Sequence, residues 1–156
     1  MTNGRPDLLK GLAPEEAAAV MALGKRMLLS SGAELFHLGQ NAEALFVLER
    51  GRIRLTLPMQ VRGREEDVLV EERVPGDTIG WSALIAPYRF TLTATAPLET
   101  EVITLSADAL RAHFAQHPSV GQAVALNLAE VIGQRLQLFQ TMWLREMQRT
   151  VELRYA

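Results

Sequence analysis

Residues 39–51 read GQNAEALFVLERG, a short apolar segment enclosed by two glycines. The same pattern continues on both sides, because from about Met27 to Ser106 short apolar segments are separated by glycines. The separating residues are Gly32, Gly39, Gly51, Gly63, Gly76 and Gly80. Short strands bounded by turn residues at such intervals are typical of an all-β sandwich or barrel. The sequence therefore predicts a β-roll over about 27–106.

Several of these segments alternate apolar and polar residues. A period of two predicts a strand with one face turned toward the interior of the roll. The alternating apolar positions are Ile53, Leu55 and Leu57; Val68 and Val70; and Phe90, Leu92, Ala94 and Ala96. Between the first two segments, Arg62-Gly63-Arg64 is predicted to form the tip of a β-hairpin.

Helical patterns flank the β-region. Pro14 is followed by Glu15 and Glu16, and this predicts a helix start, because proline presets φ and carboxylates favour the positive end of the helix dipole. Ser106 is predicted to cap a short helix that Pro118 ends. A long amphipathic helix is predicted from about 119 to 151. We expect the whole of 1–156 to form one domain.

The composition limits the function. The chain has 156 residues, no cysteine and a formal net charge of −2. Nucleic-acid-binding proteins usually carry a basic excess, because phosphate neutralisation supplies most of their affinity, so no direct nucleic-acid partner is expected. The absence of cysteine excludes disulfides and thiol catalysis. No apolar run approaches the roughly 18 residues of a membrane span, and we expect a cytoplasmic protein.

The order of helix, glycine-punctuated roll, short helix and long helix resembles the cyclic-nucleotide-binding domain family over nearly the whole chain. The matching stretches are residues 8–16 (LLKGLAPEE), 32–36 (GAELF), 39–51, 75–80 (PGDTIG) and 100–105 (TEVITL). The resemblance implies a mainly β fold with flanking α, that is, a double-stranded β-helix (jelly roll) plus an N-terminal helix and a long C-terminal helix. It also implies a regulatory or sensor role.

In that family the ligand is held by a phosphate-binding cassette. A glutamate after the second glycine accepts a hydrogen bond from the ribose, and an arginine about ten residues later pairs with the cyclic phosphate. Here Trp81 stands at the glutamate position and can only donate. Counted forward from Gly80, Arg89 falls near the arginine position. Counted back from residues 101–103, Phe90 stands there instead and Arg89 falls one residue early, which on a strand reverses its face unless a bulge restores it. We therefore expect weak or no binding of cAMP and cGMP.

Two interpretations of the cassette remain open. In one, Arg89 and nearby hydroxyl groups bind a different small anionic ligand. In the other, Trp81 and Phe90 fill the pocket as part of the core, and the chain is a structural dimerisation module without a small ligand. The candidate ligand-binding residues are Gly80, Trp81, Ser82, Ala83, Arg89, Thr91 and Thr93.

Catalysis and metal binding have little support. The jelly-roll metal enzymes called cupins need several histidines and a glutamate inside the roll, whereas His113 and His117 lie outside the β-region. Ser82 is not in a Gly-x-Ser-x-Gly nucleophile motif. We expect no catalytic residue, no metal, no cofactor and no enzymatic activity.

The long helix predicts a homodimer. It carries more apolar surface than one small roll can cover, and pairing with the same helix of a second chain would bury it. The expected interface residues are Ile132, Leu136, Phe139, Trp143 and Met147. The alternative is that the helix packs entirely on its own roll. Transcription regulators of the resembling family continue past this helix into a DNA-binding domain, whereas this sequence ends at Ala156, so we expect no DNA binding of that kind.

Overall fold

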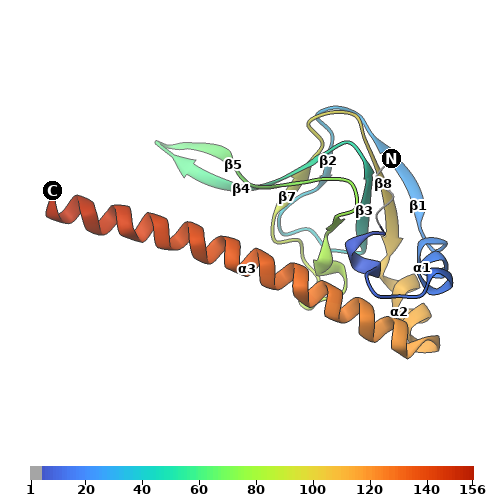
Figure 1. The fold of residues 1–156 in the computed structure, drawn as a ribbon. Coiled ribbons are helices and arrows are strands. Elements are labelled where there is room, and N and C mark those ends of the chain that lie inside the picture. The colour runs from blue at the N-terminus through green and yellow to red at the C-terminus, as the bar shows by residue number, and fades with distance from the viewer. Residues whose placement is uncertain (1–4) are drawn as a thin grey trace.

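The computed structural model describes residues 5–156, which form two four-stranded sheets with helices at one end (Figure 1). All strand pairs are antiparallel. The first sheet has the order β1 (Lys25–Leu29), β8 (Thr100–Ser106), β3 (Ala44–Arg50), β6 (Thr78–Ile79). The second has the order β2 (Glu34–Phe36), β7 (Thr93–Thr95), β4 (Ile53–Val61), β5 (Arg64–Arg73). The predicted β-roll is confirmed.

The core lies between the two sheets. The apolar positions of the segment 90–96, which are Phe90, Leu92, Ala94 and Ala96, are all buried, so their predicted inward face is confirmed. In β4 the alternation holds only through Leu55. The pairing with β5 shifts register between Leu55 and Thr56, where Val70 is the extra residue on β5, while β4 keeps a regular register with β7 from Arg54 to Thr56. Thr56, which lies between two apolar positions of the alternation, is also buried, and Leu57 is only partly buried.

The β4–β5 hairpin extends beyond the roll on the same side as the end of the long helix (Figure 1). Its tip consists of Arg62 and Gly63, with φ of 50° and 76°. Two successive residues of positive φ make the two-residue turn whose twist matches that of the flanking strands. The predicted hairpin tip is confirmed.

Helices begin and end close to the predicted positions. The 3₁₀ turn η1 (Asp7–Leu9) precedes α1 (Pro14–Met21), and β8 leads into α2 (Ala107–Gln116), where the Ser106 hydroxyl accepts a hydrogen bond from the amide of Ala109. The long helix α3 (Pro118–Tyr155) has 38 residues, or roughly 57 Å. It begins one residue earlier than predicted and ends four residues later, since the residues after Val151 include neither proline nor glycine.

Only the first part of α3 packs on the roll. Val120, Val124, Leu128 and Val131 are buried, and the Asn127 amide donates to the carbonyls of Leu8 and Lys10 at 2.8 and 2.9 Å. From residue 140 to the end of the helix every residue is exposed, and this part projects away from the roll (Figure 1). The alternative in which the whole helix packs on its own roll is wrong for this structure.

Candidate functional site

The cassette segment begins at Gly80, which links β6 to the 3₁₀ turn η2 (Trp81–Ala83). Gly80 has a φ of 80°, and a Cβ at this position would lie 3.1 Å from the ring of Phe90. Glycine is therefore required both for the backbone conformation and for the close approach of the aromatic ring. The loop after η2 includes Arg89, whose backbone forms an isolated antiparallel β-bridge with Asn41. The loop then leads into β7.

Aromatic side chains fill the space beneath this loop. The ring of Phe90 stacks on that of Phe36, with 3.8 Å between centroids, and Phe46 lies 6.0 Å from Phe36. Trp81 is partly buried and packs against the same cluster. The remaining cavity has a volume of about 10 Å³, which is room for one water molecule. It is lined by Phe36, Leu55, Gly80, Trp81, Ser82, Phe90, Thr91, Leu92 and Arg135.

The candidate ligand-binding residues do not all meet at this cavity. Gly80, Trp81, Ser82 and Thr91 line it, whereas Ala83, Arg89 and Thr93 do not. Ala83 and Thr93 are buried elsewhere in the core, and the hydroxyl of Thr93 accepts from the amide of Leu38 at 3.1 Å.

Arg89 lies on the outer surface of the loop. Its guanidinium is exposed and donates to the carbonyl of Gly39 at 3.0 Å. The next residue, Phe90, is buried. This is the arrangement expected from the register counted back from residues 101–103, because adjacent residues of an extended segment point to opposite sides.

Sequence reasoning missed Arg135, the only charged residue of the described chain that lines the cavity. It is 9% exposed, and its Nε donates to Glu71 Oε2 at 2.8 Å. Burial lowers the pKa of Arg135, while the Glu71 carboxylate acts in the opposite direction; the guanidinium remains charged at neutral pH. The available signal was its position, since it continues the buried line of Val124, Leu128 and Val131 at helical spacing.

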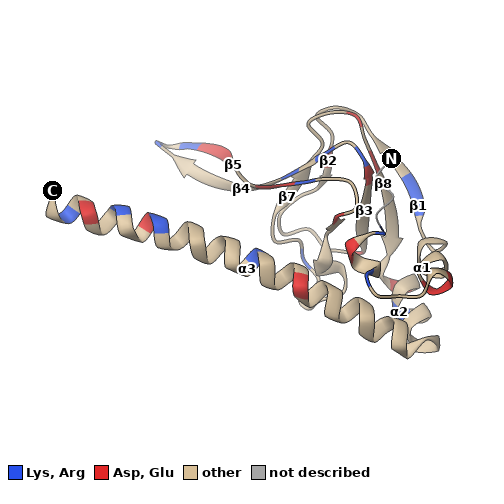
Figure 2. Cartoon of the chain, in the orientation of Figure 1, with Lys and Arg blue, Asp and Glu red and all other residues tan. Residues whose placement is uncertain are grey.

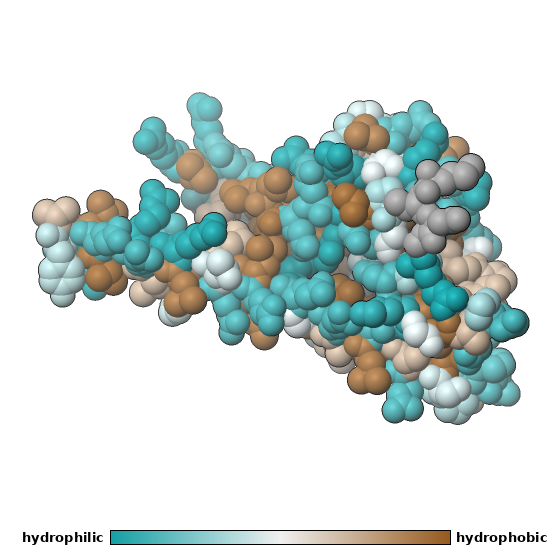
Figure 3. All heavy atoms as spheres, in the orientation of Figure 1, coloured by the Kyte–Doolittle hydropathy of each residue, from teal (hydrophilic) through white to brown (hydrophobic). Residues whose placement is uncertain are grey.

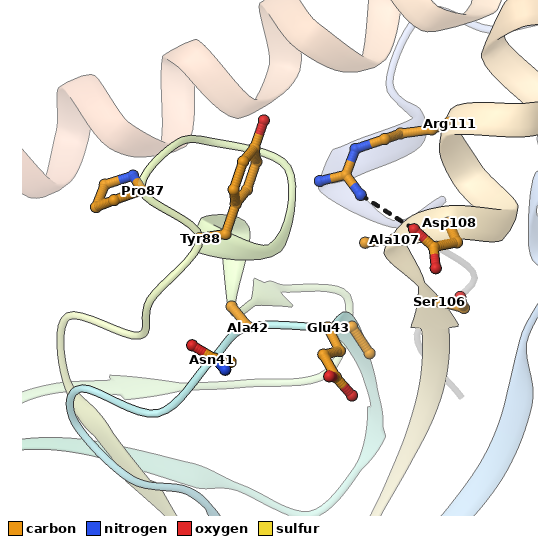
Figure 4. A pocket seen from close by; sticks show the side chains of 10 residues that line it. Asn41, Ala42, Glu43, Pro87, Tyr88, Ser106, Ala107, Asp108 and Arg111 are labelled. Carbon is orange, nitrogen blue, oxygen red and sulfur yellow. Dashed lines mark hydrogen bonds and ion pairs between the residues drawn. The ribbon is translucent and has the colours of Figure 1, made fainter.

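A second, larger hollow lies outside the roll, between the cassette loop and the start of α2 (Figure 4). Its volume is about 800 Å³, and it opens to solvent. Arg111 lies at its edge, with its guanidinium 4.9 Å from the centroid of the Tyr88 ring and hydrogen-bonded to the Ala83 carbonyl. Glu43 and Asp108 also line it, so acidic and basic groups are mixed there.

The projecting part of α3 carries an exposed apolar stripe. Leu136 and Trp143 are 58% and 62% exposed, and Met147 is exposed as well. Ile132 and Phe139 are partly buried, and Phe139 packs against the core. Hydrophobic residues are visible along this helix and on the neighbouring hairpin (Figure 3). Basic and acidic residues are interspersed along α3 (Figure 2), without the basic stripe of a nucleic-acid-binding helix.

The two histidines near the end of α2 lie next to each other. The ring of His113 stacks on that of His117, the residue that follows α2, with 4.4 Å between centroids. Within residues 5–156, no three His, Cys, Asp or Glu side chains are grouped as a metal ion would require. None of the helices in this part of the chain has both the length and the apolar character needed to cross a membrane.

Residues 5–156 thus form an eight-stranded antiparallel jelly roll, with a small cavity under the loop after Gly80 and a long helix along one side. The family model described as "Cyclic nucleotide-binding domain" matches residues 26–117. The chain belongs to the cyclic-nucleotide-binding domain family, which confirms the resemblance and the fold class expected from the sequence.

Among curated proteins, the chain is 29% identical over 135 residues to the Cyclic AMP receptor protein of Thermus thermophilus, covering 86% of this chain and 59% of that protein. It is also 29% identical over 133 residues to Glutaminase 1 of Bradyrhizobium diazoefficiens, covering 83% of this chain and 20% of that protein. Among solved structures, the Thermus thermophilus Catabolite Activator Protein matches with a TM-score of 0.73 and 27% identity, over 91% of this chain and 63% of the other. The chain therefore spans only part of the length of each of these relatives.

Proposed function

We propose that this chain is a non-catalytic, cytoplasmic regulatory domain that forms a homodimer through α3 and does not bind cAMP or cGMP in the usual mode of its family. The observation that carries the proposal is the stack of Phe36 and Phe90 beside Trp81. These rings occupy the pocket and leave about 10 Å³, far below the roughly 300 Å³ of even a small ligand pocket.

The polar groups around the pocket support the same proposal. The Trp81 indole donates a hydrogen bond but accepts none, so it cannot take the place of a carboxylate at the ribose. Arg89 faces outward, where it contacts the Gly39 carbonyl. A cyclic nucleotide in the usual position would lack both the carboxylate that binds its ribose and the arginine that binds its phosphate. Burying a phosphate without a cationic partner is strongly disfavoured.

The apolar stripe of α3 supports the homodimer. A second copy of the chain presents the same stripe, so a two-fold contact buries both at once. Soluble monomers rarely expose large contiguous apolar patches. The spacings of three and four residues along the stripe suit a parallel, coiled-coil-like pairing.

Titration calorimetry with cAMP and cGMP tests the proposal for the pocket. We expect no binding heat for the wild-type chain, and no difference between it and Arg89→Ala. Circular dichroism of both proteins controls for folding. A dissociation constant near micromolar, about −8 kcal/mol, that is lost in Arg89→Ala would contradict the proposal.

A second candidate function is a purely structural dimerisation module that binds no small ligand. The small volume of the cavity favours it, because the aromatic rings already fill most of the pocket. This candidate shares the α3 dimer with the first. The two differ in whether any small molecule changes the stability of the domain.

A further inference from the structure

The loop after η2 presents a run of apolar side chains to solvent. Four consecutive residues are exposed, namely Ile85, Ala86, Pro87 and Tyr88. The two large side chains of this run, Ile85 and Tyr88, are 39% and 44% exposed. Uncovered apolar runs of this length are unusual on a soluble domain and mark a contact surface. None of the four residues lines the cavity under the loop, so this surface is separate from the pocket that Phe90 fills.

Tyr88 is held at the surface by the surrounding fold. Its φ of 58° lies in the left-handed region, which is unfavourable for a bulky side chain. Its amide donates to the Ile85 carbonyl at 3.0 Å, and its carbonyl accepts from the Ala42 amide at 2.8 Å. The Arg111 guanidinium lies 4.9 Å from the centroid of its ring. An aromatic ring fixed in this way loses little conformational entropy when a partner covers it.

Arg111 lines two neighbouring hollows beside this loop. The smaller hollow has a volume of about 180 Å³ and is lined mainly by apolar side chains, among them Leu84, Ile85 and Phe114. A cavity of roughly 150 Å³ holds a benzene molecule, so the smaller hollow has room for one large apolar side chain. The larger hollow, of about 800 Å³, is the one that Tyr88 lines.

The charges of the larger hollow favour a cation (Figure 4). Glu43 and Asp108 line it, and Arg111 is the only basic residue of the described part of the chain that does so. Arg111 is already engaged, because its Nη1 lies 3.4 Å from the Asp108 carboxylate and its Nη2 donates to the Ala83 carbonyl at 2.8 Å. Two carboxylates and one guanidinium leave the hollow with a net negative charge, which a basic side chain would complement.

We propose that the segment 84–88 and the two hollows beside it form a docking surface for an extended segment of a partner protein. A large apolar side chain of that segment enters the smaller hollow. A lysine or arginine close to it in the partner sequence pairs with Glu43 beside the Tyr88 ring. Because Arg111 lines both hollows, the two side chains need to be only a short distance apart.

The shape and charge of this surface favour a protein segment over other occupants. Small-molecule pockets bury most of their ligand, whereas the larger hollow opens to solvent. An anionic membrane surface attracts basic segments, whereas Glu43 and Asp108 are acidic. The surface lies outside the pocket under the loop, so this inference goes beyond the proposed function.

Display of random short peptides on the purified 156-residue chain tests the docking surface. The Ile85→Asp variant removes peptides that bind elsewhere on the molecule. Ile85 is exposed, so this variant should fold normally, which circular dichroism checks. We expect the retained peptides to share a lysine or arginine near a leucine, isoleucine or aromatic residue. Fluorescence anisotropy with one labelled peptide of this kind then measures the affinity of each variant.

Glu43→Gln should weaken the binding of this peptide about two- to fivefold, the range for an exposed ion pair. Ile85→Asp should weaken it by more than about tenfold, because it places a charge where the apolar side chain is anchored. Ile85→Val should bind like the wild-type chain. The matched charge control is Glu49→Gln, the same change at an exposed glutamate that lines neither hollow.

The inference would be overturned if no peptides were enriched, if the enriched peptides were acidic, or if Glu43→Gln bound as tightly as the wild-type chain. Altered sedimentation of Ile85→Asp would also overturn it, because the loop would then contact a second copy of the chain. Binding of cAMP in calorimetry would contradict the proposed function and leave the peptide results unchanged, so the two failures are distinct.

Discussion

Replacing Leu136 and Trp143 together by aspartate is expected to convert the proposed dimer into a monomer of about half its mass, near 17.3 kDa. Both side chains are well exposed in the single chain, so the changes should leave its fold intact. In the proposed dimer each would bury an unpaired carboxylate against the partner helix, and breaking a contact in this way costs several kcal/mol. Sedimentation velocity at low micromolar concentration measures the result.

The matched control is Leu126→Asp, which is the same kind of change at an exposed position of α3 outside the stripe. This variant should remain dimeric, and circular dichroism should show the same helix content in all three proteins. Phe139 is a poorer test site, because it packs against the core and its loss would also affect the roll. A double variant that sediments as a dimer would contradict the assignment of this face.

Replacing Phe90 by alanine is expected to lower the free energy of unfolding by about 3–5 kcal/mol, the range for a buried phenylalanine. Phe90 is 6% exposed and stacks on Phe36 in the middle of the cassette pocket. The change removes this stack and enlarges the cavity. Urea denaturation at a fixed protein concentration gives the value, since the stability of a dimer depends on concentration.

The neighbouring Arg89→Ala is the control for this measurement. Its side chain is exposed and makes one hydrogen bond to a carbonyl, so the loss should stay below about 1 kcal/mol. If both alanine variants lost a similar free energy of unfolding, Phe90 would not be the buried residue of the pair. The proposal that Phe90 fills the pocket while Arg89 faces solvent would then be wrong.

The features that the sequence predicted best are those with a strong local signal. The alternation at 90–96 identified the buried face because the period of a strand is two residues. Arg62-Gly63 could be located as a hairpin tip because its turn needs two residues of positive φ. Pro14 marked a helix start because proline presets φ, and Pro118 was correctly expected to end the short helix, which stops at Gln116.

The features that the sequence did not predict depend on distant residues. The burial of Thr56 is not recorded in the alternation of β4, because the apolar residues Leu55 and Leu57 mark the opposite face of the strand. Arg135 pairs with Glu71, 64 positions earlier in the chain. Because arginine is charged, nothing in the sequence indicated that this position of the helix is buried against the roll. The hollow beside Arg111 is formed by three separate segments, so it exists only once the fold is complete.

The most direct test is native mass spectrometry of the purified 156-residue chain after incubation with excess cAMP. A filled cassette pocket and an α3 dimer together predict a species at twice 17.3 kDa with no mass increase from the nucleotide. A 17.3 kDa monomer, or a dimer carrying one cAMP per chain, would contradict it.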